Sequence, residues 1–226
     1  SPKMQDLLYV GTDDGLIHIS PDAGTTWKKI ESVAGVPSKT YVNMLLASQH
    51  SENTAYAVFN NHKNGDFKPY VYRSRDKGAT WTSISGNLPE RGSVYCIAED
   101  HVNPNLLFVG TEFGVFVTVD GGAKWTQLKA GLPTIAVRDM EIQKRENDLV
   151  LATFGRGFYV LDNYAPLREL TEEYFTNTTA GILPIKDAEM YLEGSKLGRR
   201  GKTFQGESYY TTPNPRIGAE IKYYVQ

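Results

Sequence analysis

Cysteine, histidine and net charge are all scarce in this sequence. Its 226 residues include one cysteine and four histidines, and its formal charge is −2. Cys96 cannot form an internal disulfide, and its place in the apolar segment 94–98 predicts a buried, unreactive thiol. The histidines lie far apart, without the spacing typical of a metal site, so we predict no bound metal and no cofactor. The basic residues form no stripe that would suit a nucleic acid backbone.

Long apolar runs and helical periodicity are scarce as well. No stretch approaches the roughly 20 apolar residues that a membrane-spanning helix needs, so we expect no membrane span in this chain. Before residue 165 the apolar residues do not follow a helical period, and only residues 165–174 favour a short helix. The 14 tyrosines and 21 glycines favour strands joined by tight turns. These features predict an all-β protein.

A short segment occurs three times and indicates how the strands are organised. Residues 20–27, 74–81 and 118–125 share a hydroxyl residue, an aspartate two positions later, a glycine and a final tryptophan. The tryptophans lie 54 and 44 residues apart, which is the length of a propeller blade. We call these segments the Asp-box turns, and their structural residues are Ser20, Asp22, Gly24, Trp27, Ser74, Asp76, Gly78, Trp81, Thr118, Asp120, Gly122 and Trp125.

Each position of the Asp-box turn has a physical role. The aspartate can accept N–H groups of its own turn, and the hydroxyl can add a further hydrogen bond. The glycine allows a positive φ without steric cost. The tryptophan is expected to bury its ring against the sheet. The three aspartates are therefore interpreted as scaffold and not as catalytic or Ca²⁺-binding groups.

Two further elements recur around each Asp-box turn. Hairpin patterns, each an apolar strand, a glycine-containing turn and another apolar strand, occupy residues 7–20, 106–118 and 149–162. An additional apolar strand is expected at residues 41–47, 94–99 and 136–142. The cycle gives four antiparallel strands per repeat, which predicts a β-propeller. Residues 1–164 would form about three and a half blades.

The rest of the sequence differs in character. Residues 165–213 read as an irregular connector that packs on the propeller, and residues 214–226 read as the first strand of a downstream β-sandwich domain. Three and a half blades do not close a ring. We therefore expect the remaining blades to belong to the same polypeptide, beyond the sequence given.

The repeats resemble those of the Asp-box, or BNR-repeat, propellers, which include sialidases, xyloglucanases, photosystem assembly factors and sortilin-like (VPS10-type) receptors. Residues 99–112, 152–162 and 214–225 are most like bacterial sortilin-like proteins that are often labelled glycosyl hydrolases. Phe154 departs from their pattern, which has histidine in that place. The resemblance implies a secreted, cell-surface or periplasmic interaction module that binds a protein, a peptide or a glycan.

Ligand-binding residues are expected on the face opposite the Asp-box turns, where the second and third strands of each blade are joined. The candidates there are Asp13, Asp14, His62, Glu112, Arg138 and Arg156. The alternative function is a sialidase- or xyloglucanase-like glycoside hydrolase, which would need a pair of carboxylates. Asp14 and Glu112 are the candidates for that pair. A sialidase would also need an arginine cluster, which Arg138 and Arg156 do not form in sequence.

Overall fold

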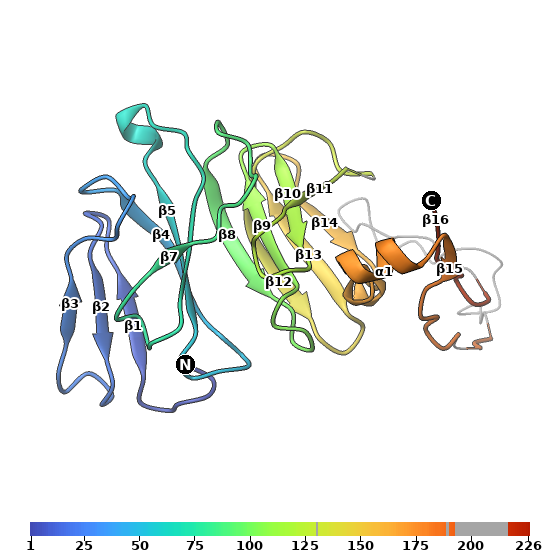
Figure 1. The fold of residues 1–226 in the computed structure, drawn as a ribbon, viewed down its shortest axis with the longest axis horizontal. Coiled ribbons are helices and arrows are strands. Elements are labelled where there is room, and N and C mark those ends of the chain that lie inside the picture. The colour runs from blue at the N-terminus through green and yellow to red at the C-terminus, as the bar shows by residue number, and fades with distance from the viewer. Residues whose placement is uncertain (130, 189, 193–216) are drawn as a thin grey trace, which may run out of the picture. The chain divides into compact units, whose positions relative to one another are not determined.

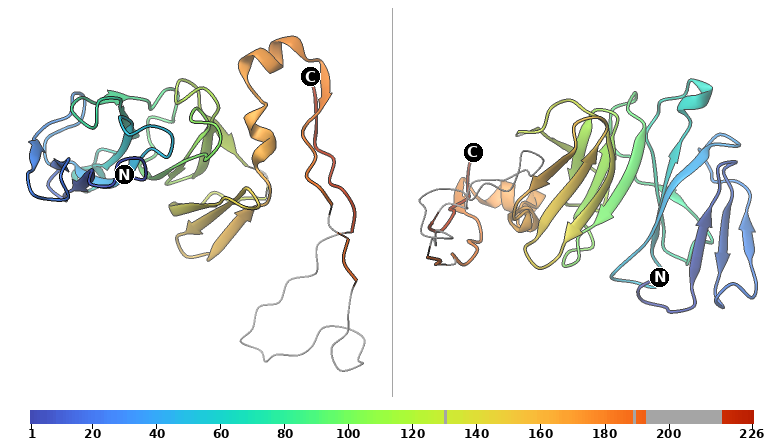
Figure 2. Two further views of the ribbon diagram at one scale, coloured as in Figure 1. Left: turned by 90° about the horizontal axis from the view of Figure 1, so that it is seen from below. Right: turned by 180° about the vertical axis from the view of Figure 1, so that it is seen from behind.

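The computed structural model describes residues 1–129, 131–188, 190–192 and 217–226. The chain divides into two compact units, Ser1–Tyr174 and Phe175–Gln226. The first unit consists of four antiparallel sheets that lie side by side in chain order (Figures 1 and 2). No helix among these residues is long and apolar enough to cross a membrane.

Each sheet of the first unit is a propeller blade, which confirms the predicted all-β fold. The blades are numbered 1 to 4 in chain order. Blade 1 contains β1 (Leu8–Gly11), β2 (Ile17–Ser20) and β3 (Lys28–Ile30), and blade 2 contains β4 (Tyr41–Ala47), β5 (Ala55–Asn60), β6 (Tyr70–Ser74) and β7 (Thr82–Ser83). Blade 3 contains β8 (Val94–Glu99), β9 (Leu107–Thr111), β10 (Gly114–Thr118) and β11 (Thr126–Leu128), and blade 4 contains β12 (Val137–Gln143), β13 (Asp148–Thr153) and β14 (Phe158–Leu161).

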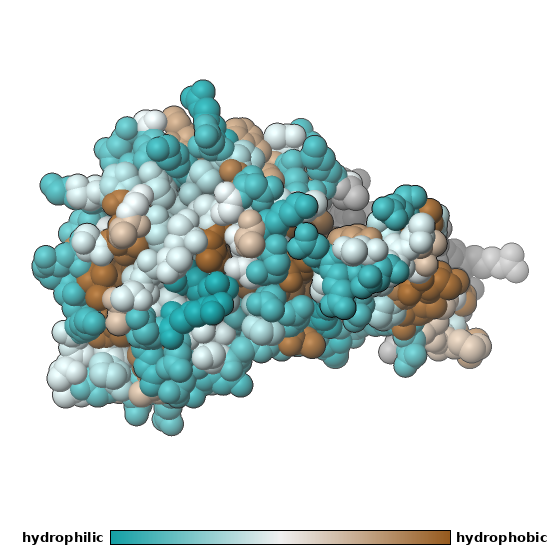
Figure 3. Space-filling view, viewed as in Figure 1, coloured by the Kyte–Doolittle hydropathy of each residue, from teal (hydrophilic) through white to brown (hydrophobic). Residues whose placement is uncertain are grey.

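The core lies between neighbouring blades. In β5, Ala57 and Phe59 pack toward blade 1, whereas Tyr56 and Val58 pack with Ile97 of blade 3. Alternate side chains of one strand therefore belong to two separate clusters, as the two-residue period of a strand requires. Strands β5, β8, β9 and β10 are buried along their whole length, because both of their faces are covered. On the face drawn in Figure 3, apolar residues of the first unit show as small patches between hydrophilic ones.

All three Asp-box turns share two backbone-to-side-chain hydrogen bonds. The backbone N–H of the glycine donates to the hydroxyl at 2.7 Å in the first turn, 2.8 Å in the second and 3.0 Å in the third. The aspartate accepts the N–H four residues further on, at 2.8, 2.8 and 3.1 Å. The glycines have φ values of 93°, 87° and 101°, a region in which a Cβ would be strained. The turn thus satisfies its own polar groups where the chain reverses.

The three tryptophan rings differ in burial. Trp125 is 3% exposed and donates its indole N–H to the carbonyl of Ile84 in the preceding blade, at 2.8 Å. Trp81 is 9% exposed and packs with Ile17 of blade 1. Trp27 is 45% exposed and donates only to Gly24 of its own turn. The expectation of burial is met by Trp125 and Trp81 and is wrong for Trp27, whose ring is half-exposed.

Two adjacent buried carboxylates link blade 3 to its neighbours in the chain. Glu99, 1% exposed, accepts hydrogen bonds from the Ser48 hydroxyl at 2.8 Å, the Gln49 N–H at 2.7 Å and the Tyr56 hydroxyl at 2.9 Å. All three donors belong to blade 2 or to the turn after β4. Such a carboxylate is stable inside a protein only while its donors stay in place.

Asp100 makes the corresponding link in the other direction. Its oxygens accept the Tyr164 hydroxyl at 2.6 Å and two N–H groups of Arg168 at 2.8 Å each. Burial opposes ionisation of this carboxyl, but the bonds from Arg168 and Tyr164 hold its pKa below the ordinary value. The segment after blade 4 is thereby attached to blade 3.

Through these bonds the segment that follows residue 164 is held against blade 3. A 3₁₀-helix, η2 (Ala165–Arg168), carries Arg168, and helix α1 (Glu172–Asn177) follows. In the second unit β15 (Ala180–Ile182) pairs antiparallel with β16 (Tyr223–Val225), so the expected connector contains a strand that the sequence did not indicate. Residues 193–213 of the expected connector lie outside the described residues, as do residues 214–216 of the expected sandwich.

We predict that Glu99→Ala lowers the free energy of unfolding by about 3 kcal/mol, since it leaves three buried or half-buried donors without an acceptor. Chemical denaturation monitored by tryptophan fluorescence measures this loss. Glu52→Ala is the matched control, because Glu52 forms only an exposed ion pair with Lys77 at 2.8 Å. Glu52→Ala should lower the free energy of unfolding by less than about 1 kcal/mol. Equal losses for the two variants would contradict the proposed link.

We also predict that Asp76→Asn destabilises the protein in a pH-dependent way. Hydrogen bonds from the side chain and backbone of Thr80 lower the Asp76 pKa from 3.8 to about 2. A carboxyl with a lowered folded-state pKa contributes stability above its unfolded pKa and loses it as the pH falls through the folded value. The difference in free energy of unfolding between wild type and Asp76→Asn should therefore be largest near neutral pH. It should shrink as the pH falls from 3.8 to 2. Denaturation at several pH values tests this, with Asp13→Asn as the exposed control.

Candidate ligand-binding groove

A groove of about 430 Å³ lies at the end of the blades opposite the Asp-box turns. We call it the loop-face groove, and its lining residues are His62, Phe67, Arg91, Gly92, Ser93, Tyr95, Glu112, Phe113 and Arg138. They come from the connection between β5 and β6, the segment between blades 2 and 3, the β9–β10 hairpin, and the first strands of blades 3 and 4. The groove thus depends on three blades that are consecutive in the sequence.

β-Bulges supply two of the central side chains. The register of the first strand shifts at the same place in blades 2, 3 and 4, where Asn43, Tyr95 and Arg138 are the extra residues. A bulge changes the direction of one side chain without interrupting the rest of the strand. The Asn43 side chain donates to the Tyr95 carbonyl, and the Arg138 guanidinium stacks on the Tyr95 ring. Equivalent positions of neighbouring blades therefore contact one another.

Tyr95 connects the cationic and anionic parts of the groove. The Arg138 guanidinium lies 3.8 Å from the centre of the Tyr95 ring and 5.2 Å from the centre of the Phe154 ring. The Tyr95 hydroxyl donates to a carboxylate oxygen of Glu112. Burial and this contact with Glu112 raise the pKa of Tyr95 to about 12, so the hydroxyl keeps its proton. The stack fixes the guanidinium before any ligand arrives.

The opposite part of the groove is aromatic. Phe67 and Phe113 are 42% and 43% exposed, and the Arg91 guanidinium lies 5.9 Å from the Phe67 ring centre. Exposed rings that share a groove with cations are suited to contact a ligand. Ser93 is 1% exposed, and its hydroxyl has no hydrogen-bond partner among the described residues. An unpartnered buried hydroxyl of this kind is unusual in a folded protein, and here it belongs to a residue of the groove wall.

The structure brings together three of the six residues predicted for this face: His62, Glu112 and Arg138. Asp13, Asp14 and Arg156 do not line the groove. Asp13 and Arg156 are exposed, and Asp14 accepts a hydrogen bond from Thr12 in its own turn.

Sequence reasoning missed Tyr95 as a site residue, because Tyr95 lies in an apolar run and only the bulge turns it toward the groove. Phe154, noted as a departure from the family pattern, places its ring near Arg138.

The groove combines aromatic, cationic and hydroxyl groups in its lining. Its lining includes one carboxylate, Glu112, whereas glycoside hydrolysis ordinarily requires two. Among the residues that the structure describes, no group of three His, Cys, Asp or Glu side chains could hold a metal ion. Aromatic rings, two arginines and a buried hydroxyl can bind and orient a ligand.

No family model matches the chain. A xyloglucanase of Hypocrea jecorina is 23% identical over 143 residues, which cover 57% of this chain and 17% of that protein. Two solved propeller structures, YCF48 bound to D1 peptide and the GH74 xyloglucanase of Xanthomonas campestris, match with TM-scores of 0.54 each. Their identities are 16% and 19%, and the matches cover 71% and 73% of this chain.

The extracellular domain of BT4673 from B. thetaiotaomicron matches with a TM-score of 0.53 and 16% identity over 72% of this chain. The chain spans 17% of the Hypocrea xyloglucanase, 27% of the Xanthomonas xyloglucanase and 49% of the YCF48 chain. These likenesses show the β-propeller fold.

Proposed function

We propose that the protein is an interaction module of the sortilin-like type, secreted or on the cell surface, whose loop-face groove binds an extended segment of another protein. The observation that carries the proposal is the convergence of stacked arginine, exposed aromatic rings and a buried free hydroxyl from three blades. Arginine and aromatic residues dominate the binding energy of known interfaces.

The groove chemistry favours a particular kind of peptide. The Arg138 guanidinium lies over the Tyr95 ring and near the Phe154 ring, and its N–H groups can donate to a carboxylate. Phe67 and Phe113 offer rings to an apolar or aromatic side chain. A segment with an acidic residue close to a bulky apolar one would satisfy both. A glycan with an acidic group is the competing ligand.

The comparisons support this proposal at the level of the fold. One similar propeller, YCF48, was solved with a bound peptide, and another similar structure is an extracellular domain. The xyloglucanases support the alternative, a glycoside hydrolase. Among the residues that the structure describes, Glu112 is the single carboxylate lining the groove, and its oxygen accepts the Tyr95 hydroxyl, so we favour binding.

The test is a selection of phage-displayed random peptides on the protein. We expect enriched peptides to contain Asp or Glu near Leu, Phe or Trp. Their affinity, measured by fluorescence anisotropy, should fall at least about tenfold with Arg138→Gln or Phe113→Ala. Arg145→Gln is the matched control and should leave affinity unchanged, since Arg145 is exposed and pairs with Glu146.

Xyloglucan oligosaccharides and a sialoside form the competing arm of the experiment. Turnover of either that is abolished by Glu112→Gln or Asp14→Asn would establish the hydrolase instead. Peptide binding that all groove variants retain would place the ligand elsewhere on the protein.

A further inference from the structure

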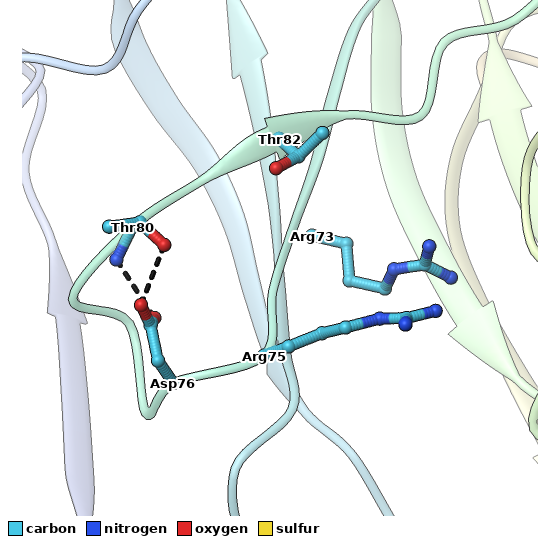
Figure 4. Close-up of a pocket in the computed structure, with 5 residues that line it drawn as sticks. All are labelled: Arg73, Arg75, Asp76, Thr80 and Thr82. Atoms are coloured by element: carbon cyan, nitrogen blue, oxygen red, sulfur yellow. Dashed lines mark hydrogen bonds between the residues drawn. The ribbon is translucent and has the colours of Figure 1, made fainter.

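A second hollow, of about 310 Å³, lies at the Asp-box end of blade 2, the opposite end of the strands from the loop-face groove. Its lining residues are Arg73, Arg75, Asp76, Thr80 and Thr82 (Figure 4). Arg73 lies on β6 opposite Thr82 of β7, and Arg75 follows β6 in the Asp-box turn. We call this hollow the arginine hollow.

The two arginines extend side by side. Figure 4 shows the two side chains running in the same direction, one from the end of β6 and one from the turn that follows it. Arg73 is half-buried and donates from Nη1 to the Gly121 carbonyl at 3.1 Å, which leaves its other N–H groups for a ligand. Arg75 is exposed and makes no hydrogen bond or ion pair with any described residue.

The one carboxylate in the arginine hollow does not neutralise them. The oxygens of Asp76 accept the Ser74 hydroxyl at 2.8 Å, the Thr80 N–H at 2.8 Å and the Thr80 hydroxyl at 2.6 Å. In Figure 4 this carboxylate points toward Thr80, whereas the guanidinium groups extend away from it. Burial and the neighbouring Arg75 lower the pKa of Arg73, which means that the two like charges already oppose each other.

The Asp-box turn does not require these arginines. At the two corresponding positions the first turn has Ile19 and Pro21, and the third turn has Val117 and Val119. The glycine N–H nevertheless donates to the hydroxyl, and the aspartate accepts the N–H four residues on, in all three copies. The arginine pair is thus a feature of blade 2 alone among the three Asp-box turns, and the scaffold does not explain it.

We propose that the arginine hollow binds a tetrahedral oxyanion, a sulfate or phosphate group, between the guanidinium groups of Arg73 and Arg75. Two guanidinium groups match the charge of a dianion and provide several N–H donors in fixed directions. The hydroxyl of Thr82 lines the same hollow and can donate to a further oxygen. Such a site would be separate from the loop-face groove and would let the module engage two ligand groups at once.

The test is an NMR titration with inorganic sulfate and with inorganic phosphate at constant ionic strength. We expect saturable shifts of the backbone N–H signals of Arg75, Asp76 and Thr82, and an affinity at least about fivefold weaker in Arg75→Gln. Arg75→Lys keeps the charge but loses the planar set of N–H donors, so its anion affinity should lie between those of the wild type and Arg75→Gln. Arg145→Gln and Arg138→Gln should bind sulfate as the wild type does, which separates this site from the proposed peptide groove.

Glucose 6-sulfate and glucose 6-phosphate are added as a third arm. If the sugar esters bind more tightly than the inorganic anions, the ligand group comes from an esterified sugar. If both bind equally, the ligand is the free anion. Shifts that do not saturate, or that Arg75→Gln leaves unchanged, would overturn the proposal. Arg75 is chosen over Arg73 because Arg73 also holds the Gly121 carbonyl.

Discussion

The structure depends on the burial of both faces of each blade by its neighbours. A single four-stranded sheet with apolar residues on both faces has no stable state alone in water, and stacking the sheets removes those faces from solvent. The fully buried strands β5, β8, β9 and β10 belong to the two central blades. Exposure is greatest at the two ends of the array, where Val10 is 45% and Phe158 is 77% exposed. The contrast between Trp125 and Trp27 has the same origin.

Polar groups specify how the blades meet. Apolar faces can slide, because hydrophobic contact has no direction, whereas a buried carboxylate requires its donors at fixed positions. Glu99 and Asp100 are adjacent in sequence and bond in opposite directions, to blade 2 and to the segment after blade 4. The alignment of blades 3 and 4 also brings together the bulges that carry Tyr95 and Arg138. The groove is therefore a product of how the blades are aligned, and not of any one loop.

The two candidate sites use opposite ends of the blades. In blade 2 the strand β6 runs from the groove end at Tyr70 to the hollow end at Arg73, which separates the sites by about 10 Å along the strand. Both sites present arginine, but in different settings. Arg138 is stacked on rings, which suits a carboxylate beside an apolar group, whereas Arg73 and Arg75 face open space together, which suits a more highly charged anion.

The sequence by itself determined the blade repeat, the Asp-box turns and three groove residues, His62, Glu112 and Arg138. These follow from local rules, since the aspartate, hydroxyl and glycine of each Asp-box turn bond within that turn. Strand order then assigns each loop to one end of the blade. Only the tertiary structure decided which residues meet. Tyr95 enters the groove through a bulge, and Trp27 stays half-exposed. Asp14 and Arg156 stay outside the groove. Such outcomes arise from contacts between segments distant in sequence, which no local pattern encodes.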